Sequence, residues 1–202
     1  MSTDPLIDEA LRVVEADPDG HLPLRLRRRI RRRFGPVVGV ANGGPTDGLR
    51  AVVRLDRLAA ERVQRHWDAG TGGDGGFRRM LDLADELLAG TAEPRQAERE
   101  MDRFELATDD LMGPERPLRA GLAGLAAARL VGRVLAGDYS EQLPADTDDE
   151  DLDSDAWETA YLASLAESSV PDEPDYDPAA RRAFWRWYLG EAIPSIDQDW
   201  HH

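Results

Sequence analysis

Apolar residues recur along this chain at intervals of three and four positions, and no segment alternates between apolar and polar residues for long. Such spacing places apolar side chains on one face of an α-helix, whereas strict alternation is typical of a strand. The pattern therefore predicts an all-α fold, a bundle of about eight helices in one domain that spans residues 1–202.

Capping and turn residues divide this pattern into separate helices. Proline in a first turn and glycine after a last turn are typical boundaries. We expect helices at about 5–15, 22–34, 47–69, 77–88, from Thr91 or Glu93 with Pro94 onward, 117–136, 155–167, and from Pro178 to near Gly190. The segment 117–136 is apolar almost all round, which is typical of a helix at the centre of a bundle. Residues 137–154 are expected to form an acidic linker inside the domain.

Composition excludes several classes of protein. Cysteine is absent, which removes disulfides and thiolate chemistry and suits a reducing cytoplasm. No stretch approaches the roughly 18 apolar residues of a membrane span, and the acidic N-terminus lacks the basic and apolar parts of a secretory signal. We therefore expect a cytoplasmic protein without a membrane partner.

The net charge is concentrated at one end of the sequence. The chain carries −15 overall; residues 1–136 sum to zero, and residues 137–202 hold 18 acidic side chains against 3 arginines. An acidic surface of this kind repels nucleic acid and attracts a basic protein. The charge distribution favours a basic protein partner over DNA or RNA.

A dense basic run precedes these acidic residues. Residues 25–33 hold seven arginines, while apolar residues at four-residue spacing form one stripe of the same predicted helix: Leu22, Leu26, Ile30 and Phe34. Six of the arginines lie outside that stripe, which predicts a basic face that is solvated or paired within the molecule. A face that contacts a partner is the alternative; a nucleic-acid arm would need interleaved aromatics, and a membrane helix a larger apolar face.

The candidate binding residues lie in the acidic segment 146–155. Seven carboxylates are predicted to contact a partner: Asp146, Asp148, Asp149, Glu150, Asp151, Asp153 and Asp155. A solvated loop without a partner is the other interpretation of this segment. A calcium loop needs glycine at its sixth position and glutamate at its twelfth, and no register of this segment supplies both. Whether the segment meets the arginine run is left open by the sequence.

No residues suggest catalysis or a bound cofactor. The sequence GTGGDG at 70–75 matches a dinucleotide-binding pattern, but a helix precedes it where that motif needs a strand. His21 and His66 lie far apart in the sequence without other ligands nearby, and no serine has a nucleophile-elbow context. We expect no enzyme activity, no cofactor and no metal. A hydrolase that uses clustered carboxylates and a metal is the weakest of three hypotheses.

Four segments together resemble one protein family. They are GHLPLRLRRRI at 20–30, RLAAERVQRHWDAG at 57–70, FRRMLDLADELLAG at 77–90 and RRAFWRWYLGEAIPS at 181–195. Their order and spacing are similar to the all-helical immunity protein family numbered five in bacterial polymorphic toxin systems. One departure is GTGGDGG, which stands where the family pattern leads us to expect an acidic, proline-containing turn.

The resemblance implies a non-enzymatic protein that binds and neutralises a cognate toxin domain in the cell that produces it. Trp67, Trp185 and Glu191 match recurring family positions, for which we expect structural roles. Many such toxins are basic nucleases, to which an acidic protein is complementary in charge. The alternative function is a helical adaptor or regulator that binds a basic protein unrelated to toxins.

Overall fold

The computed structural model describes residues 4–113 and 118–200, and this part of the chain is built from helices and turns. Within it no strand forms; an isolated bridge joins Val38 to Gly137. The described helices include none that is both long enough and apolar enough to cross a membrane. The predicted all-α class is confirmed.

The main helices follow the predicted order. Their bounds are α1 (Pro5–Ala16), α2 (Leu24–Arg31), α3 (Asp47–Thr71), α4 (Gly76–Leu88), α5 (Pro94–Asp109), α6 (Leu118–Ala136), α7 (Thr159–Ser168), α8 (Pro178–Trp187) and α9 (Ile193–Trp200). A π-helical turn, η6 (Tyr188–Ala192), joins α8 to α9 in one continuous rod. Counted with that rod as one, the described residues form the eight helices expected.

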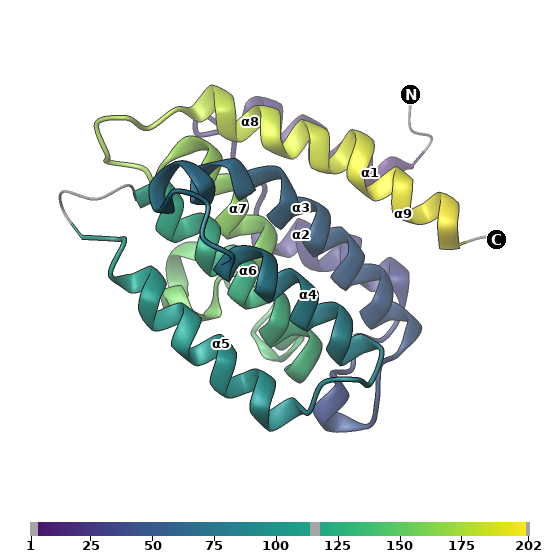
Figure 1. Cartoon of the computed structure of the whole chain (residues 1–202). Helices are drawn as coiled ribbons and strands as arrows, with labels where there is room; N and C mark the ends of the chain where they lie inside the picture. Colours follow the sequence, from purple (N-terminus) through teal and green to yellow (C-terminus); the bar gives the residue numbers. More distant parts are fainter. Residues whose placement is uncertain (1–3, 114–117, 201–202) are drawn as a thin grey trace.

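Helix α6 occupies the centre of the bundle, where it packs against α3, α4, α5 and α7 (Figure 1). Its small residues let neighbouring helices approach closely. A side chain at Gly124 would overlap Thr108 and the Trp67 ring, and Trp67 in turn packs against the ring of Phe104, 5.0 Å away between centroids. The predicted central position of this helix is confirmed.

The C-terminal rod crosses one side of the bundle beside α1 (Figure 1). Three of its aromatic residues are buried in the core, Phe184, Trp185 and Tyr188, whereas Trp187 is half-buried. These three aromatic side chains are therefore part of the core. The rod does not end near Gly190 as predicted, because buried Ile193 and Ile196 continue its apolar face beyond the glycine.

The segment between α6 and α7 also differs from the prediction. It contains three short 3-10 turns, η3 (Tyr139–Gln142), η4 (Asp149–Asp151) and η5 (Ser154–Ala156). Helix α7 begins only at Thr159, because Glu158 occupies the N-cap position with extended backbone. The segment is more than a connection, since Asp138, Asp149 and Glu158 are buried.

The close packing at Gly124 generates a stability prediction. Gly124→Ala should lower the free energy of unfolding by about 1–3 kcal/mol, because the methyl group overpacks against Trp67 and Thr108. Urea unfolding followed by circular dichroism measures the change. Gly132→Ala in the same helix is the control, since its methyl group would meet only Met101 at 3.6 Å. Equal stability of the two variants would contradict the packing described for α6.

Candidate partner-binding site

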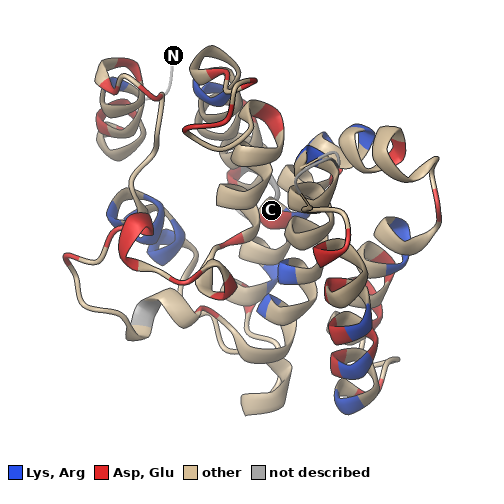
Figure 2. Cartoon of the chain, turned by 90° about the vertical axis from the view of Figure 1, so that its left-hand side faces the viewer, with Lys and Arg blue, Asp and Glu red and all other residues tan. Residues whose placement is uncertain are grey.

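The acidic segment 146–155 lies against α2, the helix that carries the arginine run (Figure 2). Six of its seven predicted contact residues are exposed: Asp146, Asp148, Glu150, Asp151, Asp153 and Asp155. Asp149 is the exception, because its side chain is only 2% exposed and faces inward. The surface that the segment offers to a partner is therefore formed by the six exposed carboxylates.

Asp149 attaches the segment to α2 through Arg27. The Arg27 guanidinium donates to both Asp149 oxygens, and its Nη1 lies 3.0 Å from Oδ2. The same guanidinium donates from Nε to Glu158 at 3.0 Å and from Nη1 to the Leu22 carbonyl at 2.6 Å. It also lies over the Tyr161 ring, 5.1 Å from the ring centroid. Every side of this buried cation has a partner.

Arg31, one helical turn later on the same face of α2, makes a second set of buried pairs. Its Nε donates to Asp138 at 2.8 Å, and its Nη1 donates to Glu158 at 2.7 Å. A third donor reaches the Ser140 hydroxyl at 2.8 Å. Glu158 thus accepts from both Arg27 and Arg31 and holds the start of α7 against α2.

Arg133 of α6 completes the buried ion network. It donates to Asp56 of α3 at 3.1 Å and lies 2.8 Å from Asp138. The network therefore contains three guanidiniums and four carboxylates: Arg27, Arg31 and Arg133 with Asp56, Asp138, Asp149 and Glu158. It links α2, α3, α6 and both ends of the segment 138–158.

The pKa values within the network follow from competition between burial and pairing. Burial, the largest single effect, would raise the pKa of Asp149, but the charge of Arg27 and the hydrogen bonds from Arg27 and His21 together outweigh it, and the pKa lies well below its ordinary value. The same balance lowers the pKa of Asp138 and of Glu158. At Asp56 burial prevails over Arg133, so its pKa is raised. Three of the four carboxylates are thus held firmly ionised.

The interpretation of the arginine run as a basic face turned mainly to solvent is wrong for three of its seven residues. Arg27, Arg28 and Arg31 are 4% exposed or less, and Arg28 donates to the carbonyls of Leu143 and Pro144. A stripe of four apolar residues marks only one contact face of α2. The acidic segment packs on a second face, and that face buries the arginines because it brings their carboxylate and carbonyl partners. The other alternative weighed for this face, internal pairing, describes them correctly.

His21 also contacts the acidic segment. Its Nε2 lies 3.1 Å from Asp149 and 3.8 Å from Asp148, and the ligand atoms of these three residues lie within 4.8 Å of one another. The His21 Nδ1 lies 3.0 Å from an Arg181 nitrogen, and because a guanidinium can only donate, Nδ1 must accept. Nε2 then carries the hydrogen and donates to Asp149. A complete hydrogen-bond pattern, with no need for a metal, accounts for this group.

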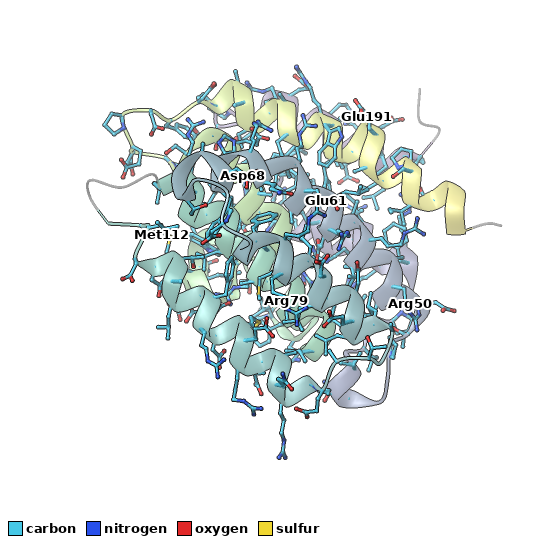
Figure 3. All side chains as sticks on the ribbon, viewed as in Figure 1. Arg50, Glu61, Asp68, Arg79, Met112 and Glu191 are labelled. Atoms are coloured by element: carbon cyan, nitrogen blue, oxygen red, sulfur yellow. The ribbon has the colours of Figure 1, made fainter. Side chains whose placement is uncertain are left out.

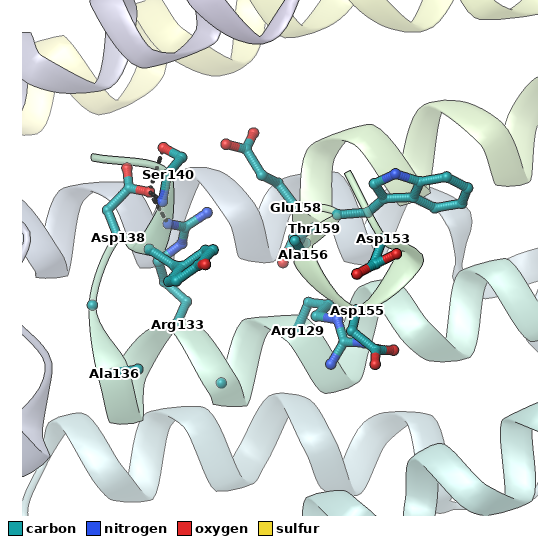
Figure 4. A pocket seen from close by; sticks show the side chains of 14 residues that line it. Arg129, Arg133, Ala136, Asp138, Ser140, Asp153, Asp155, Ala156, Glu158 and Thr159 are labelled. Carbon is teal, nitrogen blue, oxygen red and sulfur yellow. Dashed lines mark hydrogen bonds and ion pairs between the residues drawn. The ribbon is translucent and has the colours of Figure 1, made fainter. Parts of the chain in front are cut away.

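A pocket of about 440 Å³ opens beside the acidic segment, between α6 and the start of α7 (Figure 4). Asp153 and Asp155 line it together with Tyr139, Trp157, Thr159 and Arg129. Figure 4 shows Arg129 beside Asp155, and Arg133 beside Asp138, on opposite parts of the wall. Two of the predicted contact residues therefore line a cavity.

The other residues singled out in the sequence occupy mainly structural positions. Trp67 and Trp185 are buried, whereas Glu191 lies at the surface of the C-terminal rod (Figure 3). The 70–75 turn joins α3 to α4, and the Trp67 indole donates to Asp74 within it at 2.9 Å. His201 and His202 lie outside the described residues.

Sequence reasoning did not identify the partners within the buried ion network. The available signal was the four-residue spacing of Arg27 and Arg31, which puts both on one helix face. Nothing in the sequence indicates that Glu158 and Asp138 face them, since those residues lie 107 or more positions away. The cavity beside Trp157 was also not predicted.

Removing one charge from the network should destabilise the protein strongly. Arg31→Met is expected to cost about 3–5 kcal/mol of unfolding free energy, because it leaves Asp138 and Glu158 buried with too little positive charge. The matched control is Arg29→Met in the same helix, which breaks only an exposed pair with Glu9 and should cost less than about 1 kcal/mol. Chemical denaturation at pH 7 measures both. Similar small losses would show that the buried pairs do not hold the segment.

Comparison with known proteins tests the resemblance seen in the sequence. The model of a family described as Immunity protein Imm5 matches residues 7–195. Among curated proteins, none matches the sequence. The family match covers nearly the whole chain, including α2, the acidic segment and most of the C-terminal rod, and it confirms the resemblance. The protein belongs to the Imm5 immunity protein family.

Proposed function

We propose that this protein binds a cognate bacterial toxin domain and blocks it in the producing cell. Membership of an immunity protein family suggests an immunity function and implies a protein toxin as partner, and such proteins are generally non-enzymatic. The finer proposal is that the toxin is basic and nuclease-like, and that the exposed residues of the acidic segment contact it.

One observation carries this proposal: the segment that presents six exposed carboxylates is attached to α2 by the buried ion network. Asp149 and Glu158, which flank most of them, are fixed by Arg27 and Arg31. A charged surface that is ordered before binding loses little entropy when a partner docks. Complementary charge also speeds association and selects among partners.

The mechanism of neutralisation follows from the same surface. A toxin that cleaves nucleic acid must present cations to the phosphate backbone. The six carboxylates would pair with those cations, and the bundle behind them would cover the substrate-binding face. This blocking needs no chemical step in the immunity protein, in keeping with the absence of a catalytic motif from the sequence.

A rescue assay tests the function directly. The toxin domain encoded beside this gene is expressed in a bacterial host with and without this protein, and surviving cells are counted. Immunity predicts restored growth and a complex that copurifies. Failure to restore growth, with an active toxin and both proteins soluble, would contradict the immunity proposal. It would favour the alternative, a helical adaptor for another basic protein.

The contact surface is tested by neutralising its charges. Changing Asp148, Glu150, Asp151 and Asp153 to the matching amides should weaken toxin binding and flatten its salt dependence, because fewer complementary charges remain. Asp149 is left unchanged, since its loss would disturb the fold. The control neutralises four exposed acids of α5 and the turn after it: Glu98, Asp102, Asp109 and Asp110. Titration calorimetry at two salt concentrations measures both; equal effects would place the interface elsewhere.

A further inference from the structure

We propose that the pocket beside the acidic segment receives a single arginine side chain of the bound partner. The proposal deepens the proposed function, on which it rests, by naming the chemistry of one contact. The pocket lies between α6 and the start of α7, and its lining includes the exposed Asp153 and Asp155 of the candidate surface (Figure 4).

The charges on the wall favour a cation. Arg129 and Arg133 line the pocket with four carboxylates, of which Asp138 and Glu158 belong to the buried ion network, whereas Asp153 and Asp155 are exposed. Arg133 is committed to Asp56 and Asp138, and Arg129 to Glu105. Asp155 is 94% exposed and lies 3.5 Å from Arg129, a long contact that leaves its carboxylate able to bind a second cation.

Two of the lining residues have a buried polar atom without a hydrogen-bond partner among the described residues, the Thr159 hydroxyl and the Arg129 Nε. The Thr159 hydroxyl oxygen has no hydrogen bond among the described residues, and because the residue is only 1% exposed, a guanidinium reaches this oxygen only when the wall shifts slightly. A buried hydroxyl without a partner is costly. A guanidinium carries five donors in one plane and could satisfy this oxygen and the Asp155 carboxylate together. The positive end of α7 is offset by Glu158 at its N-cap position.

Two aromatic residues make the pocket suitable for a flat cation. Trp157 and Tyr139 both line it, and Tyr139 is 54% exposed. The Trp157 indole is held in place by donating to the Asp149 carbonyl at 3.3 Å and by an edge contact with Tyr161. A guanidinium stacks on aromatic faces better than an ammonium does, so the combination selects arginine over lysine.

The size of the pocket agrees with a single side chain. Its volume of about 440 Å³ is near the lower end of the roughly 300–1,000 Å³ typical of ligand pockets. That space holds one long side chain with ordered water, and it excludes a helix of the partner.

The first experiment uses the protein alone with small probes. N-acetyl-arginine N-methylamide is titrated into labelled protein while the Trp157 indole signal is followed by nuclear magnetic resonance. Saturable shifts of that signal are expected with this probe, weaker shifts with the capped lysine analogue, and none with capped citrulline, which has the same shape without the charge. Equal binding of citrulline, or binding of inorganic phosphate in place of arginine, would overturn the proposal.

Variants then connect the probe to the pocket. Asp155→Asn should weaken arginine-probe binding at least about fivefold, because it removes a charged hydrogen-bond acceptor, whereas Asp146→Asn, outside the pocket, should not. Thr159→Val should weaken binding of the probe without lowering the stability of the free protein, since no described residue hydrogen-bonds to its hydroxyl. A Thr159→Val variant that binds the probe normally would contradict the assignment of that hydroxyl.

Toxin binding separates this inference from the proposed function. If the wild-type protein rescues cells but does not respond to the arginine probe, the pocket proposal is contradicted and the immunity proposal is supported. A specific probe response without rescue would keep the pocket and remove the toxin as its partner. With both correct, Asp155→Asn and one arginine-to-alanine change in the toxin should show coupled rather than additive losses of affinity.

Discussion

The structure of the candidate binding surface depends on one buried interaction, the pairing of Arg27 and Arg31 with Asp149, Glu158 and Asp138. Without it the segment between α6 and α7 would carry dense negative charge with little apolar surface to bury. Like charges at this density repel, and such a segment has little tendency to fold on its own. The two arginines reverse that tendency, because each one fixes two carboxylates that lie more than 100 residues from it in the sequence.

Buried ion networks are not favoured for stability alone. Desolvating several charges costs free energy that pairing only partly returns, and apolar replacements of similar volume are often as stable. Here the network supplies geometry: it fixes the path of residues 138–158 across α2, α3 and α6. Carboxylates that turn inward set the backbone, and the intervening ones consequently point outward. The same segment thus supplies both the exposed carboxylates of the acidic surface and the buried carboxylates of the ion network.

The same segment frames the cavity beside Trp157. Glu158 faces Arg27 and Arg31, while the next residue, Thr159, lines the cavity and has a buried hydroxyl to which no described residue hydrogen-bonds. The Trp157 indole donates to the Asp149 carbonyl, so the cavity wall is attached to the network as well. An arginine from a partner would meet a wall that is already ordered. Specific binding of a basic protein by a strongly acidic one needs such fixed positions, because bulk charge alone does not discriminate between cations.

Much of the fold was accessible from the sequence. The three- and four-residue spacing predicted every main helix, and the small apolar residues of 117–136 predicted the central one, because these features depend on local geometry and on which face must be buried. The order of four segments also indicated the family. Tertiary structure alone decided which charges are buried. Nothing local distinguishes Asp149 from Asp148, or Arg31 from Arg29; only the packing of the acidic segment on α2 puts one of each pair inside, where a partner over a hundred residues away neutralises it.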